Sequence, residues 1–230
     1  MEIEKKHIKI ELTEAMLGTV PKNKDVYSKH IATKVRALAK HREENEEDLL
    51  SDIIEEEVET VEDIEEKGWT GFHRDEQGIF IYNYMIKGFA KAATDVAIEV
   101  GWIKPKIVNY KKWLDLLLFI ETRKLRFMDG NGTIIAVPDG TLERPIRMMT
   151  PRGPRVTVTR SDTVDGGRLL EFDITLLPNS KGVCWNNLRH SFNYGERVGL
   201  GQWRGSGGYG SFKVVSIEDV MDRKDTPIIE

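Results

Sequence analysis

The chain has 230 residues, of which 40% are hydrophobic and 31% charged, a size that fits one domain with large insertions or two small domains. Its single cysteine, Cys184, excludes an intrachain disulfide and a cysteine-based zinc site. The sequence contains no apolar run of about 18 residues, so it predicts no membrane span. The first residues lack the apolar segment of a secretion signal, and we therefore expect a cytoplasmic protein.

The formal net charge of −4 conceals an uneven distribution. Residues 43–66 carry 14 of the 38 acidic residues and no Lys or Arg, so the rest of the chain is basic. This asymmetry predicts a nucleic-acid-binding surface together with a separate acidic arm. The alternative is a solvated acidic helix on an otherwise ordinary protein.

The first half of the chain begins with a strand and continues into a long insertion. Residues 7–13 alternate, with Ile8, Ile10 and Leu12 on the buried side. Residues 25–66 read as helical, first basic and then acidic. The glycine-containing stretch 68–80 predicts a turn-rich connector, and apolar residues at three- and four-residue steps from Ile81 to Val96 predict a helix. A short helix over 110–118 and short strands over 124–149 follow.

The second half is expected to contain a hairpin, a helix and a closing strand. Residues 155–160 and 168–177 are predicted to pair across an Asp-Gly turn, the first strand placing Val156 and Val158 inward. The second strand is predicted to bury Leu170, Phe172, Ile174 and Leu176. A helix over 183–198, a glycine-rich loop over 199–212 and a strand over 212–217 complete the chain.

Without the insertions at about 20–78 and 100–150, the order is strand, helix, strand, strand, helix, strand. This order predicts an α+β protein with the ferredoxin-like βαββαβ core that is shared with the RRM. We expect a single domain over 1–230, with the last strand at the sheet edge beside the first. Because this fold carries many functions, the function must be argued from the site.

The glycine-rich loop is the first candidate site. Glycines allow the backbone N–H groups to approach a phosphate closely, and Trp203 and Tyr209 can stack on bases while Arg204 pairs with phosphate. The loop follows a helix and precedes a strand, which is the reverse of a dinucleotide-binding fingerprint, and it lacks a Walker lysine. The alternative is a flexible loop with two incidental aromatic residues.

A second candidate is the proline-interrupted segment 142–160, which cannot form a regular helix. Guanidinium groups match phosphate oxygens, so the segment predicts contact with a nucleic-acid backbone. Pairing of its arginines with nearby surface acids is the alternative. These arginines are Arg144, Arg147, Arg152, Arg155 and Arg160.

Three stretches together resemble a known family: IELTEAMLGT at 10–19, GIFIYNYMIKGFAKAA at 78–93 and GLGQWRGSGGYGSFKV at 199–214. They are similar, in order and spacing, to segments of the RAMP superfamily, and especially to the crRNA-binding backbone subunits of CRISPR effector complexes. The resemblance implies a ribonucleoprotein subunit that binds single-stranded RNA, without a cofactor or a metal, alongside repeated copies of itself or other effector subunits. It also implies a thumb-like element that crosses the strand, which segment 142–160 or the basic helix at 27–42 would supply.

The resemblance places the nucleic-acid-binding residues at the Lys-Gly pair and in the glycine-rich loop. These residues are Lys87, Gly88, Gly201, Trp203, Arg204, Gly207, Gly208, Tyr209 and Gly210.

Evidence for catalysis is weaker, since no metal-ligand or triad-like spacing surrounds the histidines. RNA-processing members of the resembled superfamily use a histidine as acid or base, which makes His30 and His73 candidates. Asp25 is the candidate for the cleavage that some backbone subunits perform, although a lone Asp before a helix usually serves as an N-cap. A non-catalytic RNA-binding subunit is the main prediction. The alternatives are a metal-independent endoribonuclease of the same fold and a subunit mimic, from a phage or mobile element, that acts on a CRISPR complex.

Overall fold

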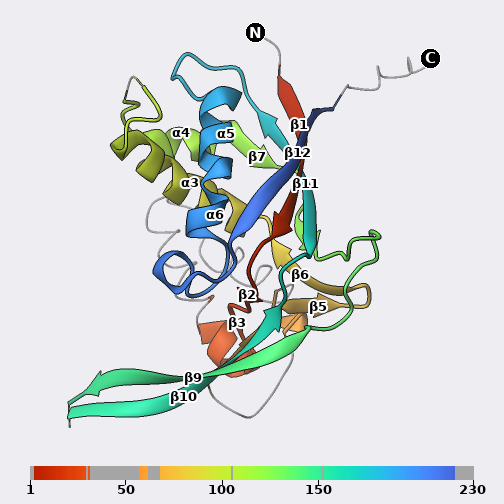
Figure 1. Ribbon diagram of the computed structural model, residues 1–230, viewed down its shortest axis with the longest axis vertical. Coiled ribbons are helices and arrows are strands. Elements are labelled where there is room, and N and C mark those ends of the chain that lie inside the picture. The colour runs from red at the N-terminus through yellow and green to blue at the C-terminus, as the bar shows by residue number, and fades with distance from the viewer. Residues whose placement is uncertain are drawn as a thin grey trace, which may run out of the picture.

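The computed structural model describes residues 3–29, 31, 57–61, 68–104, 106–151 and 153–220. It is an α+β protein with several antiparallel sheets and a few helices (Figure 1). Most of the acidic segment 43–66 lies outside the described residues. The same is true of the predicted basic helix at 27–42, of which residues 27–29 and 31 are described. Within the described part of the chain, no helix combines the length and the apolar character that a membrane crossing needs.

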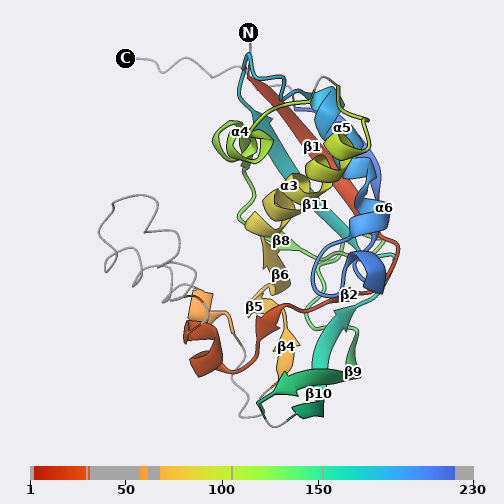
Figure 2. The ribbon, with the colours of Figure 1, turned by 90° about the vertical axis from the view of Figure 1, so that its left-hand side faces the viewer.

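A four-stranded sheet forms the centre of the molecule. Its strands lie in the order β12-β1-β11-β7, and each neighbouring pair is antiparallel. Helices α3 and α5 cover one face of this sheet, as Figures 1 and 2 both show. These elements are β1 (Glu4–Leu12), α3 (Tyr84–Glu99), β7 (Leu118–Ile120), β11 (Leu169–Leu176), α5 (Trp185–Asn193) and β12 (Phe212–Asp219).

The core lies between this sheet and the two helices. Ile8, Ile10 and Leu12 of β1 are buried, as the alternation predicted, because successive side chains of a strand point to opposite faces. The predicted inward residues of β11 are also buried. Phe89 of α3 and Phe192 of α5 pack against them in the same cluster. The buried apolar residues of these elements therefore form one contiguous core.

A second sheet lies beyond one end of the first. It contains β9 (Gly140–Thr150) and β10 (Gly153–Val164), which form a long hairpin that projects from the body in Figure 1 and is called the ribbon below. Three short strands flank its root: β2 (Met16–Leu17), β3 (Val20–Pro21) and β4 (Trp69–Gly71). A third sheet contains β5 (His73–Asp75), β6 (Gly78–Tyr82) and β8 (Lys124–Arg126). Helices α4 (Tyr110–Leu117) and α6 (Gly195–Val198) and the 3-10 turn η1 (Gly205–Gly207) complete the elements.

A buried ion pair fixes the root of the ribbon. The Lys22 ammonium lies 2.9 Å from the Asp162 carboxylate, and both residues are buried. The second carboxylate oxygen accepts a hydrogen bond of 2.7 Å from the indole Nε1 of Trp69, over whose ring the ammonium also lies. The three side chains join the Pro21–Asn23 turn, β4 and β10, so the orientation of the ribbon depends on them.

The predicted hairpin between residues 155–160 and 168–177 is wrong. β10 pairs with β9, whereas β11 pairs with β1 and β7. The Asp-Gly turn instead carries the chain from one sheet to another, and Gly167 N–H donates to the carbonyl of Leu12 at 2.7 Å. In chain order, the second strand of the central sheet is β7. It lies inside the segment 100–150, which the sequence analysis assigned to an insertion.

Two further sequence predictions are corrected. Val156 and Val158 are 71% and 57% exposed rather than inward, because this part of the ribbon projects past the sheets and no layer formed by the described residues covers its faces. The stretch 68–80 is not a turn-rich connector: it forms β4, β5 and most of β6, and α3 begins at Tyr84, so Ile81 lies in a strand.

Candidate nucleic-acid interface

The glycine-rich loop divides into an anchored part and an exposed part. Gly199, Gly201 and Gly210 adopt positive φ angles of 70°, 81° and 69°, and a Cβ at any of them would collide with backbone atoms. The N–H of Gly210 donates to the carbonyl of Ala15 at 2.8 Å, and its carbonyl accepts from Leu200 at 2.8 Å. These three glycines therefore serve the packing of the loop itself, and the buried Gly210 in particular presents no amide to a ligand.

The exposed part runs from Trp203 to Gly208 and contains η1. A Cβ at Gly205 or Gly208 would meet no atom within 4 Å, and both residues have positive φ angles. Gly207 lies behind the Trp203 side chain. This stretch leaves backbone accessible, as a phosphate-binding loop requires.

An arginine of the ribbon joins this loop to β9. The Arg144 guanidinium lies 4.3 Å from the centre of the Trp203 ring and 5.3 Å from that of Tyr209. Its Nε and Nη1 are buried and have no hydrogen-bond partner among the described residues, and this burial lowers the pKa of Arg144 below its ordinary value. Trp203 has a positive φ of 54°, a conformation that non-glycine residues rarely adopt, and is 48% exposed. Arg144 therefore contacts both of the predicted stacking rings.

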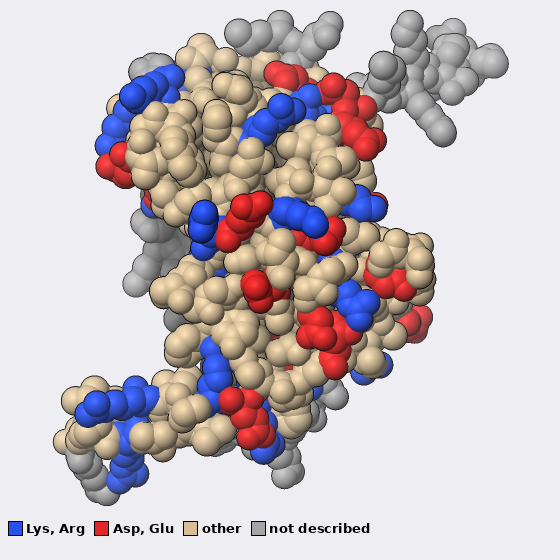
Figure 3. All heavy atoms as spheres, viewed as in Figure 1, with Lys and Arg blue, Asp and Glu red and all other residues tan. Residues whose placement is uncertain are grey.

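The other arginines lie along the ribbon on alternate faces. The register places Arg155 on the same face as Arg144, and Arg147 on the opposite face with Val156. Arg147 and Arg155 are exposed, and neither forms an ion pair with a residue that the structure describes. Arg160 lies at the root, where it pairs with Glu143 at 2.6 Å. Figure 3 shows basic side chains gathered on the outer ribbon and an acidic group near its root.

Arg152 lies outside the described residues.

The Lys-Gly pair on α3 is split between two environments. The Lys87 ammonium donates to the Asp115 carbonyl of α4 at 2.9 Å, and burial lowers its pKa. Gly88 is exposed and lines a cavity together with Gly201 and Arg204 of the glycine-rich loop. The structure therefore brings Gly88, but not the Lys87 side chain, to the predicted site.

The two catalytic candidates that the structure describes, His73 and Asp25, do not gather at this site. His73 is only 3% exposed, its Nδ1 lies 2.8 Å from the Thr60 hydroxyl and its Nε2 lies 3.4 Å from the Tyr27 hydroxyl. Asp25 is exposed in the first turn of the helix at 24–29, whose N-cap is Asn23, which accepts from the Val26 N–H at 3.1 Å. His30 lies outside the described residues.

Sequence reasoning missed the buried cluster to which His73 belongs. The Tyr27 hydroxyl donates to Glu57 at 2.7 Å, and the His73 ring stacks on Phe80 and meets Tyr82 edge-on. Burial and the Glu57 carboxylate raise the pKa of Tyr27 well above its ordinary value. The apolar run of β6 was a signal in the sequence, but it was divided between the predicted connector 68–80 and the predicted helix that began at Ile81.

The face of the central sheet that the described helices leave uncovered carries charged and polar side chains in contact with one another. His7 Nδ1 lies 2.8 Å from Asp173, Lys9 pairs with Glu171 at 2.7 Å and Lys213 pairs with Glu11 at 2.9 Å. An RRM uses aromatic residues on this face to stack bases. Here the outward side chains of β1 and β11 are charged or polar, so these two strands do not provide such a platform.

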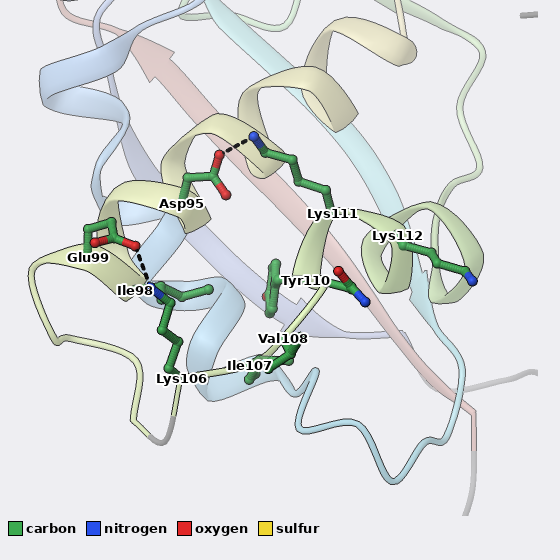
Figure 4. A pocket seen from close by; sticks show the side chains of 10 residues that line it. Asp95, Ile98, Glu99, Lys106, Ile107, Val108, Tyr110, Lys111 and Lys112 are labelled. Carbon is green, nitrogen blue, oxygen red and sulfur yellow. Dashed lines mark hydrogen bonds and ion pairs between the residues drawn. The ribbon is translucent and has the colours of Figure 1, made fainter.

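A larger cavity of about 770 Å³ lies between α3 and the 106–112 segment (Figure 4). Lys111 points toward Asp95, and Lys106 lies 2.7 Å from Glu99. These lysines are neutralised by acids of the same cavity, which makes it a poor site for a polyanion.

No protein-family model matches the chain, and no curated protein matches it in sequence. Among solved structures, the chain is similar to one in "Cryo-EM structure of the Type III-B Cmr-beta bound to cognate target RNA", with a TM-score of 0.46 and 12% identity. The match covers 95% of this chain and 61% of that chain, so this chain spans less than two thirds of its structural neighbour. Similarity at this level establishes neither a shared activity nor a shared ligand.

Proposed function

We propose that the protein is a non-catalytic subunit of RAMP type that binds single-stranded RNA and assembles with effector subunits or further copies of itself. The strand order β12-β1-β11-β7, with α3 between β1 and β7 in sequence and α5 between β11 and β12, supports a ferredoxin-like core. Residues 1–230 then form a single domain, to which parts of the segments 20–78 and 100–150 are added.

The observation that carries the proposal is the junction of two phosphate-binding candidates. The exposed loop around Gly205–Gly208 begins at Trp203, and Arg144 ties that ring to the ribbon on which Arg147 and Arg155 are exposed. Guanidinium groups beside an accessible backbone fit a phosphate chain, and the partly exposed Trp203 ring fits a base. The sequence resemblance to crRNA-binding subunits favours RNA as the ligand.

Fluorescence anisotropy with a labelled RNA of about 16 nucleotides, the upper end of common single-strand site sizes, tests the proposal. We expect binding that weakens steeply between about 50 and 200 mM salt because phosphate contacts release counterions. Replacing Arg147 and Arg155 together by Ala should weaken binding and reduce the salt slope by about 1.4, since each single-strand phosphate contact contributes about 0.7.

The matched control is Lys106→Ala with Lys111→Ala, which removes the same charge at the cavity of Figure 4. We expect this control to bind RNA almost as the unmodified protein does. Absence of RNA binding at low salt would refute the proposal, and so would a control pair that weakens binding as much as the arginine pair.

A further inference from the structure

A cavity of about 340 Å³ lies beside the glycine-rich loop, where three distant segments of the chain meet. Its walls come from the first turns of α3, from residues 19–27 and from the anchored start of the loop. The volume lies at the small end of the roughly 300–1,000 Å³ that small-ligand pockets occupy, so it suits one small group rather than a folded element. None of the described residues that line it is acidic.

Gly88 is the residue of this wall that the fold itself does not explain. It lies in the interior of α3, where glycine is less favourable than alanine, and its φ is not positive. A Cβ at this position would meet no atom of the described residues within 4 Å. By contrast, Gly201 in the same wall is required by a positive φ and by the carbonyl of Leu17. The described residues therefore leave the space in front of Gly88 open, and none of them requires a glycine there.

The remaining walls carry groups that recognise a base. Tyr84 is 46% exposed at the cavity, and its ring lies on Tyr82 with centres 5.7 Å apart and planes at 21°. Burial and the nearby Glu57 raise the pKa of Tyr84 above its ordinary value. Gln202 contributes an amide that both donates and accepts, and Arg204 is exposed at the rim.

We infer that this cavity holds one nucleobase of the bound RNA, unstacked from its neighbours, with Tyr84 contacting the ring and Gln202 bonding to its edge. The base lies against the helix at Gly88, and Arg204 holds the adjoining phosphate. This inference rests on the proposed RNA binding. It adds a base-binding subsite to a protein that otherwise contacts the RNA backbone.

Two RNA probes of equal length separate the subsite from backbone binding: a labelled 12-mer with bases and a labelled 12-mer in which every base is absent. Gly88→Leu fills the cavity and Tyr84→Ala removes the ring, whose stacking corresponds to an affinity change of about 5- to 150-fold. We expect both variants to weaken binding of the 12-mer with bases at least about 5-fold. Binding of the baseless 12-mer should be nearly unchanged.

Gly130→Leu is the matched control, because a Cβ at Gly130 also meets open space at an ordinary φ, in a loop away from the cavity. The thermal midpoint of Gly88→Leu should equal or exceed that of the unmodified protein. Gln202→Ala should reduce discrimination among 12-mers of single base type. If Gly88→Leu leaves both probes unaffected, or weakens both equally, the subsite is refuted while RNA binding stands. If the unmodified protein binds neither probe, the proposed function and the subsite are both refuted.

Discussion

Replacing Asp162 by Asn tests the ion pair at the root of the ribbon. Asp162 is 4% exposed and Lys22 is 8% exposed, so the pair is screened little by solvent. Removing one charge of a buried pair costs about 3–5 kcal/mol, because the remaining charge keeps its desolvation penalty without the matching attraction. Asparagine has nearly the same shape, and its amide oxygen can still accept the Trp69 indole bond. We therefore expect a loss near the lower end, about 3 kcal/mol in the free energy of unfolding.

Urea denaturation followed by tryptophan fluorescence measures this loss. The control is Glu11→Gln, which removes the surface partner of Lys213 and should cost at most about 1 kcal/mol. A variant that removes both buried charges, Lys22→Met with Asp162→Leu, should recover a large part of the loss. A loss below about 1 kcal/mol for Asp162→Asn, or a double variant no more stable than the single one, would refute the reasoning.

Three further predictions concern stability. Gly210→Ala should lower the free energy of unfolding by more than about 1 kcal/mol in the same assay, because a Cβ there collides with a backbone carbonyl at positive φ. Arg126 holds the pKa of Asp75 below its ordinary value, first through its hydrogen bonds, so the ionised carboxylate stabilises the fold above about pH 4 and this contribution is lost as the pH falls further. Asp75→Asn should therefore be less stable than the unmodified protein at pH 7, with a smaller difference in acid. Val156→Thr should change stability by less than about 0.5 kcal/mol, whereas Ile174→Ala should cost about 2–5 kcal/mol, which thermal melts would show.

The parts of the fold that the sequence predicts are those with a clear period. Alternation in β1 and β11, and helical spacing in α4 and α5, identify both the element and its buried side. Alternation does not identify the neighbour of a strand, which is why β10 was paired with β11. Alternation also does not show whether another layer covers the strand. The sequence therefore predicts burial for Val156 just as it does for Ile174. β7 has only three residues and is too short for any period.

The candidate site was predicted in its residues and less well in their roles. Composition identifies a glycine-rich loop, but the requirement for Gly210 comes from a carbonyl ten residues away, and that for Gly201 from Leu17. Trp203 and Arg144 are 59 positions apart in sequence, so their contact is a property of the fold. His73 lies between Gly71 and Gly78 in the sequence. Its burial depends on Tyr27 and Thr60 from the preceding insertion. Sequence reasoning names such residues and cannot supply their neighbours.

The twelve residues of β10 span two very different surroundings. Among the described residues, 153–159 pair with β9 alone, while Arg160, Ser161 and Thr163 have a strand on each side. Amide deuterium uptake along this one strand should therefore be fast toward the tip and slow at the other end, without any break in its secondary structure. The outer part of the ribbon can therefore open locally, while its root is as stable as the sheet to which it is attached.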